Sequence, residues 1–205
     1  EMSELYKDKI DVRFGVELGL MPGIEEKVRN YVSKWPEYDF IIGSTHLVRG
    51  LDPYYPSYYE GRSSREALRE YFECILTSVR TFDDFDVYGH LDYIVRYLPG
   101  GEKDYCFKDH ADIFEEIFKV LISKGKGIEI NTGSLYKKMT FPHPHIEALK
   151  MYKAMGGEII TVGSDAHVTD YICYGFETVV KDLLTSLGYK YYTTFKNRKP
   201  EFNPI

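Results

Sequence analysis

Five side chains that can bind a metal ion each follow a short apolar segment of this chain. They are Glu17 in Gly-Val-Glu, His46 in Gly-Ser-Thr-His, His90 in Gly-His-Leu-Asp, and Asp165 and His167 in Gly-Ser-Asp-Ala-His. A carboxylate or imidazole at the end of a strand is held by the sheet yet open to solvent, as a catalytic metal and its bound water require. Their shared placement predicts a metal-dependent hydrolytic site.

The ligand types indicate which ions this site would take. Mixed imidazole and carboxylate ligands are typical of zinc, manganese and iron, whereas thiolate-rich sites favour softer ions. Glu17 could bridge two ions because its carboxylate has two oxygens, while His46 and His90 complete the shell of one ion. Asp165 and His167 are then left for other ions. Taken singly, each residue could equally be a surface carboxylate or a structural histidine, so the prediction depends on their joint placement.

Other polar residues near these motifs have two readings each. Arg96, just beyond the His90 loop, could hold a phosphate through its bidentate fork, or could be a surface arginine. The Tyr-rich loop 52–62 is long enough to cover a site as a lid, or could simply pack. Asn131 could contact substrate or cap the next turn. His143 has proline on both sides and is interpreted as part of a helix entrance, and His110 is expected on a solvated helix face.

Composition limits the class of protein. The chain has 205 residues, 43% of them hydrophobic, and a formal net charge of −6. This length predicts a single domain over 1–205, and the charge argues against a nucleic-acid partner. Three widely spaced cysteines indicate neither a disulfide framework nor a cysteine zinc finger. No apolar run reaches the roughly 20 residues that cross a bilayer, so we expect no membrane association and a cytoplasmic location.

Hydrophobic periodicity predicts alternating strands and helices. Expected strands cover 12–17, 39–43, 86–89, 127–130, 158–162 and 189–195, and expected helices cover 24–32, 63–79, 107–121, 144–156 and 169–187. Repeated βα units imply an α/β fold with parallel strands inside and helices outside, favouring a TIM-type barrel over an open doubly wound sheet. Six strands are too few for a regular eight-stranded barrel, so the barrel would be small and distorted or lack a part.

Taken together, these motifs resemble those of the histidinol-phosphatase branch of the polymerase and histidinol phosphatase (PHP) superfamily, over nearly the whole chain. The resemblance implies a distorted (β/α)7 TIM-like barrel with a cluster of up to three metal ions. It also implies hydrolysis of L-histidinol phosphate, a small phosphorylated substrate, to L-histidinol and phosphate in histidine biosynthesis. By motif, Glu17 would bridge two ions, His46 and His90 would bind one, Asp165 the other and His167 the third, with Arg96 contacting phosphate.

Two motifs of the family have no counterpart here. Neither the family's His-x-His on its first strand nor the next histidine-bearing motif, after its second strand, occurs before Glu17. We therefore expect an N-terminally incomplete member that lacks its first one or two βα units and hydrolyses the substrate poorly on its own. Another small-molecule phosphoesterase, or a non-catalytic remnant that binds a metal or partner, is the alternative. An exposed strand edge could also pair with a second copy, giving a homo-oligomer.

Overall fold

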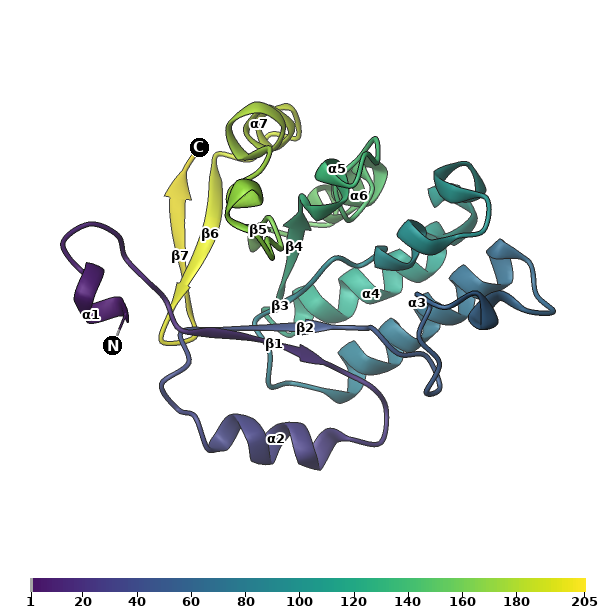
Figure 1. Cartoon of the computed structure of the whole chain (residues 1–205), viewed down its shortest axis with the longest axis horizontal. Helices are drawn as coiled ribbons and strands as arrows, with labels where there is room; N and C mark the ends of the chain where they lie inside the picture. Colours follow the sequence, from purple (N-terminus) through teal and green to yellow (C-terminus); the bar gives the residue numbers. More distant parts are fainter. Residues whose placement is uncertain (1) are drawn as a thin grey trace.

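A five-stranded parallel sheet forms the centre of the computed structural model, which describes residues 2–205 (Figure 1). Neighbouring strands follow chain order, and each pairs in parallel with the next. Because every strand runs the same way, their carboxyl ends gather at one edge of the sheet. The strands are β1 (Gly15–Gly19), β2 (Phe40–Ser44), β3 (Val87–Tyr88), β4 (Gly127–Asn131) and β5 (Ile160–Gly163).

Helices connect these strands and lie outside the curved sheet. Figure 1 shows α2 beside β1 and β2, and α3, α4 and α6 following one another along the outer side. The α/β fold predicted from the alternating pattern is therefore observed, although the sheet does not close into a barrel within residues 2–205. The helices are α1 (Met2–Tyr6), α2 (Glu25–Ser33), α3 (Ser64–Thr81), α4 (Ala111–Ser123), α5 (Gly133–Tyr136), α6 (Ile146–Ala154) and α7 (Lys181–Ser186).

The longest helix, α3, forms where the sequence predicts it. Ser63 caps it by accepting the Glu66 backbone N–H, and the Glu66 carboxylate accepts the Ser63 backbone N–H at 2.8 Å, which completes a capping box. Apolar residues at helical spacing, such as Phe72 and Ile75, are fully buried. The Phe72 ring meets Phe114 of α4 at a centroid distance of 4.8 Å. This packing holds the two helices against the sheet.

The end of the chain differs from the prediction of a single last strand over 189–195. Strand β6 (Tyr191–Lys196) turns back into β7 (Lys199–Pro204), and the two form an antiparallel hairpin. Asn197 and Arg198 make the turn with positive φ angles of 49° and 62°. The hairpin docks on the parallel sheet, because Thr193 accepts the Ile160 backbone N–H at 3.2 Å.

The predicted helix over 169–187 is also wrong in its continuity. The structure has a 3-10 turn (Thr169–Tyr171), a short π-helix (Phe176–Val180) and then α7. Gly175 adopts a left-handed φ of 73°, which interrupts the helix between the first two pieces. Within residues 2–205, no helix combines the length and apolar character needed to span a bilayer. All three cysteines are free.

Candidate metal centre and active site

Glu17, His46 and His90 converge at the carboxyl ends of the first three strands. Glu17 lies on β1, and His46 and His90 come two residues after the ends of β2 and β3. Glu17 Oε1 is 2.9 Å from His46 Nε2 and 3.1 Å from His90 Nε2, and one candidate ligand atom from each residue lies within 4.8 Å of the others. Chain order and parallel pairing therefore bring together three residues that are far apart in sequence.

The spacing of these three atoms suits a single divalent ion. Ligands placed tetrahedrally around zinc at about 2.0 to 2.1 Å lie about 3.3 Å from one another. The observed 2.9 Å and 3.1 Å separations would need to open by only a few tenths of an ångström. Two histidines and one glutamate also leave a fourth position free for water, as in catalytic zinc sites. The donor set thus fits a catalytic ion.

The protonation of this cluster favours a charged carboxylate. Burial would raise the pKa of Glu17, but its hydrogen bonds with His46 and His90 outweigh burial and hold the pKa far below its usual range. Burial lowers the pKa of His90, yet the hydrogen bond with Glu17 and the charges of Glu129 and Glu17 leave that pKa above its ordinary value. Glu17 therefore carries its negative charge at neutral pH, as a metal ligand must.

Aromatic rings extend outward from this cluster. Tyr93 packs against both histidines, with ring centroids 4.8 Å from His46 and 4.9 Å from His90, whose own centroids are 5.1 Å apart. Tyr97 follows at 5.1 Å from Tyr93, and Tyr54 of loop 52–62 lies 5.3 Å from Tyr97. Tyr54 is 59% exposed. The loop thus contributes an exposed aromatic ring that is linked through Tyr97 and Tyr93 to the candidate metal-ligand cluster.

Packing also accounts for part of the same loop. Tyr58 and Tyr59 are buried, and their hydroxyl groups donate to the backbone oxygens of Ala67 and Pro53 at 3.0 Å. The Tyr58 contact fixes the loop to α3, and the Tyr59 contact holds two parts of the loop together. Packing is therefore observed for this part of loop 52–62, and its role as a lid stays a prediction.

Arg96 is buried and belongs to the same end of the sheet. Its side chain is 4% exposed, which rules out the reading of a surface arginine. Its guanidinium donates to Asn131 Oδ1 at 3.0 Å, lies 5.0 Å from the Tyr93 ring centroid, and has one nitrogen 3.7 Å from Asp165 Oδ2. Asn131 Oδ1 also accepts the Gly133 N–H at 2.9 Å. Asn131 therefore caps its turn and orients Arg96.

Asp165 and His167 lie apart from the three-residue cluster. Asp165 adopts a positive φ of 52°, and its backbone oxygen accepts the Tyr136 hydroxyl at 2.8 Å. The His167 side chain is 88% exposed, with Nε2 3.4 Å from Asp165 Oδ1. Within residues 2–205 the structure thus brings Asp165 beside Arg96 but leaves the His167 ring in solvent. Metal binding by these two residues stays a prediction.

Glu129 is a buried acid that was not among the predicted site residues. Its Oε2 accepts the His90 backbone N–H at 3.1 Å and the Asn131 side-chain amide at 3.2 Å. Burial raises the pKa of Glu129 above its usual value. Gly163 makes room for it, because a Cβ there would lie 2.3 Å from Glu129 Oε1. An acid in the middle of the buried segment Gly127–Asn131 was the available signal.

Asp92 and His143 form a hydrogen-bonded pair that the sequence motifs did not indicate, and both residues are fully buried. His143 Nδ1 is hydrogen-bonded to Asp92 Oδ1, and Asp92 Oδ2 accepts the His145 backbone N–H at 2.7 Å. Burial lowers the pKa of His143, so the ring is neutral at pH 7. The predicted helix entrance is confirmed, since His145 caps α6 by accepting the Glu147 N–H at 3.2 Å. His143, however, points into the protein.

The prediction of a solvated His110 is wrong. Its side chain is buried, with the residue only 1% exposed, and its ring packs against Phe72 at a centroid distance of 5.2 Å. A 3-10 turn (Phe107–His110) precedes α4 and directs the ring toward α3. The residue is therefore part of the interface between these helices.

The PHP domain family matches residues 2–133, which is most of the chain and includes Glu17, His46 and His90. The chain belongs to this family. Its histidinol-phosphatase branch is indicated by a probable histidinol-phosphatase of Clostridium acetobutylicum, 32% identical over 83% of this chain and 66% of the relative. A histidinol-phosphatase of Lactococcus lactis is 30% identical over 97% of this chain and 73% of that protein.

Two solved structures agree in fold with this chain. A crystal structure of the Lactococcus lactis histidinol phosphate phosphatase, complexed with zinc, L-histidinol and phosphate, matches 98% of this chain and 75% of that one, with a TM-score of 0.83 and 29% identity. A putative histidinol phosphatase of Listeria monocytogenes matches 86% of this chain and 71% of that chain, with a TM-score of 0.73 and 17% identity. The second likeness supports the fold alone.

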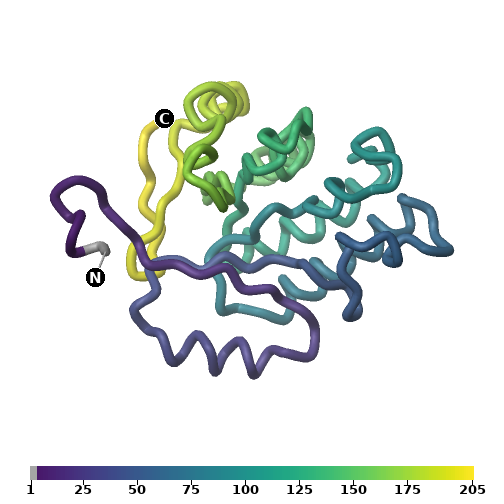
Figure 2. Tube along the Cα trace, in the orientation of Figure 1, coloured from purple at the N-terminus to yellow at the C-terminus, as the bar shows by residue number. Residues whose placement is uncertain are grey.

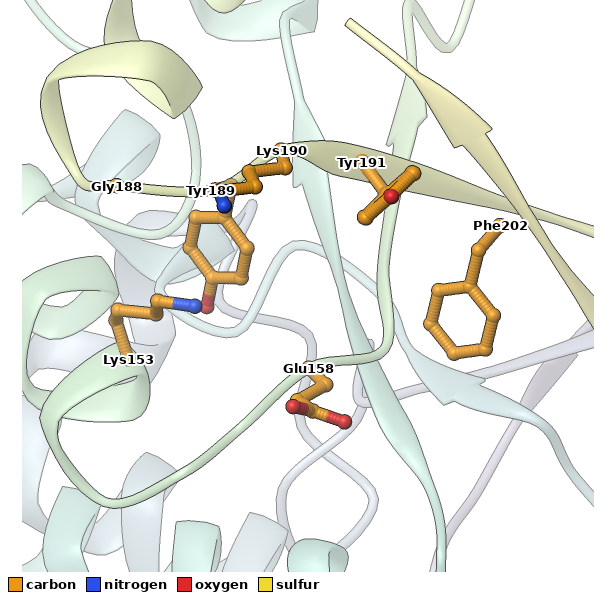
Figure 3. Close-up of a pocket in the computed structure, with 7 residues that line it drawn as sticks. All are labelled: Lys153, Glu158, Gly188, Tyr189, Lys190, Tyr191 and Phe202. Atoms are coloured by element: carbon orange, nitrogen blue, oxygen red, sulfur yellow. The ribbon is translucent and has the colours of Figure 1, made fainter.

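A separate pocket of about 490 Å³ lies away from these PHP motifs (Figure 3). It opens between the end of α6 and the β6–β7 hairpin, and Lys153 Nζ lies 4.2 Å from the centre of the Tyr189 ring at one wall. None of the predicted site residues lines it, so its size alone does not mark the chemistry. Its lining consists of Lys153, Glu158, Gly188, Tyr189, Lys190, Tyr191 and Phe202.

Proposed function

We propose that this chain is a metal-dependent phosphatase that hydrolyses L-histidinol phosphate to L-histidinol and phosphate in histidine biosynthesis. The observation that carries the proposal is the convergence of Glu17, His46 and His90 on one ion-sized position. Support for the substrate comes from the Lactococcus lactis phosphatase, which matches nearly the whole chain and was crystallised with zinc, L-histidinol and phosphate.

Glu17, His46 and His90 would hold a divalent ion, zinc, manganese or iron, in this proposal. A bound ion of this kind lowers the pKa of water and offsets negative charge on the phosphate. Glu17 keeps its carboxylate ionised, because the pKa of that group is held far below neutral. Asp165 and His167 would bind further ions, up to three in all, and share the catalytic role with Glu17.

Arg96 would bind the phosphate oxygens. Its burial strengthens a charge-assisted hydrogen bond, and its planar fork matches two oxygens of one phosphate. Asn131 and Asp165 restrict the guanidinium, so it is oriented before the substrate arrives. The same preorganisation would keep the phosphorus close to the three metal ligands.

The aromatic surface beside the cluster suits the substrate's imidazole ring. Tyr54 exposes most of its ring, and Tyr97 is half-buried next to it at 5.3 Å. Flat aromatic rings favour edge and face contacts with another ring. An aromatic phosphate ester would therefore be bound better than an aliphatic one of the same charge.

Phosphate release from L-histidinol phosphate by the purified chain, with zinc or manganese supplied, tests the proposal. We expect slow phosphate release that Glu17→Gln removes, while Glu26→Gln on the exposed side of α2 leaves the rate unchanged. Preference for another small phosphate ester, such as phosphoserine, would favour a different phosphoesterase. Zinc binding without any phosphate release would favour a non-catalytic remnant.

We further infer a single domain over 1–205, working in the cytoplasm on a small phosphorylated substrate without nucleic acid or membrane. The buried apolar residues form one cluster reaching from Leu20 to Tyr189, which supports a single domain. Among the described strands, β1 pairs with β2 alone, so its other edge could take a second copy. A monomeric mass in solution would count against this homo-oligomer.

A further inference from the structure

A buried hydrogen-bonded pair, Asp92 and His143, lies beneath the residues that hold Arg96. Both side chains are fully buried, and both oxygens of Asp92 are used, one by His143 Nδ1 and the other by the His145 backbone N–H. A buried carboxylate is stable only when its oxygens are satisfied in this way. The pair therefore locks the segment before α6 to the loop that follows β3.

The locked segment is joined to Asn131 through its backbone. Asn131 N donates to the His143 oxygen at 2.7 Å, and His143 N donates to the Asn131 oxygen at 2.9 Å. The Asn131 side chain is held at both ends, since Nδ2 donates to Glu129 and Oδ1 accepts from Arg96 and from Gly133. Asn131 cannot rotate without breaking these bonds, so the position of its backbone decides where its Oδ1 lies.

We propose that Asp92 and His143 are positioning residues that set the orientation of Arg96 through Asn131. This inference rests on the proposed role of Arg96 in phosphate binding. A planar fork must be aligned with two phosphate oxygens, and a displacement of about 1 Å can cost about 100-fold in rate. His143 itself touches neither the phosphate nor the candidate metal ligands. It acts by fixing the backbone that carries Asn131.

Two substitutions of His143 separate this role from simple packing. His143→Asn places an amide nitrogen close to the position of Nδ1 and keeps a donor for Asp92, whereas His143→Gln places its amide near Nε2 and loses that donor. We expect His143→Gln to weaken binding of inorganic phosphate to the zinc-loaded chain by about tenfold. Losing a hydrogen-bond partner that orients a binding residue typically has an effect of this size. His143→Asn should restore most of the affinity. Isothermal titration gives both dissociation constants.

His110→Gln is the matched control. His110 is equally buried but packs between α3 and α4, without a contact to Asn131 or Arg96. The His110→Gln variant should have a lower unfolding temperature and an unchanged phosphate affinity. A similar loss of phosphate affinity in His110→Gln would show that loosened packing alone explains the effect, and would overturn the proposal.

A double-mutant cycle with Arg96→Lys decides whether His143 acts through Arg96. If it does, His143→Gln should change phosphate affinity by less than about twofold when Arg96 is already lysine. If the loss of affinity in the double variant equals the product of the losses in the two single variants, the inference is overturned. Failure of the unmodified zinc-loaded chain to bind phosphate would overturn it as well. If His143→Gln fails to fold, Asp92→Asn reports the same link, since Asn cannot accept both N–H groups.

The phosphate-binding experiments and the test of the proposed function can fail independently. Phosphate coupling between His143 and Arg96 without hydrolysis of L-histidinol phosphate would reject the proposed substrate and keep the positioning role. Hydrolysis with independent effects of the two residues would keep the function and reject the positioning role.

Discussion

Zinc should stabilise this chain through Glu17, and the size of the effect can be worked out from the site. The Glu17 carboxylate is hydrogen-bonded to both histidines of the cluster, so it links all three candidate ligands. Replacing it by glutamine keeps the shape but removes the negative charge and the anionic ligand atom. Two imidazoles that belong to different loops would remain, and they bind a divalent ion far more weakly.

The expected stabilisation follows from mass action. Free zinc at 100 times its dissociation constant stabilises the folded state by about 2.7 kcal/mol. For a chain of 205 residues, each kcal/mol raises the unfolding temperature by about 2 to 4 °C. Zinc should therefore raise that temperature by about 5 to 11 °C in the unmodified chain, and by less than about 2 °C in Glu17→Gln.

Thermal unfolding followed by circular dichroism, with and without zinc, measures this difference. Glu26→Gln removes an equal charge from the exposed face of α2 and should keep the full zinc shift. Equal zinc shifts in Glu17→Gln and the unmodified chain would refute the reasoning, because the ion would then be bound elsewhere.

Four further outcomes are expected. Arg96→Lys keeps the charge but loses the planar fork, so catalytic efficiency toward L-histidinol phosphate should fall at least tenfold, by about 1.4 kcal/mol or more; unchanged efficiency would remove Arg96 from the site. Burial lowers the pKa of His90 but Glu17 and Glu129 raise it overall, so His90 stabilises the metal-free fold at low pH and this gain is lost as pH rises through the raised pKa. Protons compete for the same nitrogen, so zinc affinity by calorimetry should drop as pH falls below that pKa, and a flat profile would contradict this. Ser63→Ala removes the cap of α3 and should cost about 1 kcal/mol, or about 2 to 4 °C in thermal unfolding, with zinc affinity unchanged. The chain extended at its amino end by a His-x-His segment should release phosphate faster than residues 1–205 alone; equal rates would show that the present ligands suffice.

Features that depend on neighbours in sequence were predictable. The capping box at Ser63 and the apolar spacing of α3 are local patterns, and the helix begins where they indicate. The meeting of Glu17, His46 and His90 could be anticipated for a related reason. Parallel strands in chain order align their carboxyl ends, so residues at three strand ends must approach one another.

Features that depend on a distant partner were not predictable in the same way. The β6–β7 hairpin turns at Asn197 and Arg198, and the sequence there lacks the glycine that commonly marks such a turn. Strand β7 also contains Pro200 and Pro204, which weaken the signal for a strand. Antiparallel pairing with β6 stabilises this strand although its local strand propensity is low.

The two kinds of histidine in this site show why sequence patterns alone could not assign them. His90 and His143 are both buried and both bonded to a carboxylate, Glu17 in one case, 73 residues away, and Asp92 in the other, 51 residues away. The Glu17 side chain is 35% exposed, whereas Asp92 is completely enclosed and also holds a backbone N–H. An ion can enter between Glu17 and its histidines with little rearrangement, but entry between Asp92 and His143 would break the lock on Asn131. Exposure of the carboxylate therefore separates the candidate metal-ligand pair from the proposed positioning pair, and exposure is a property of the folded chain that no local motif encodes.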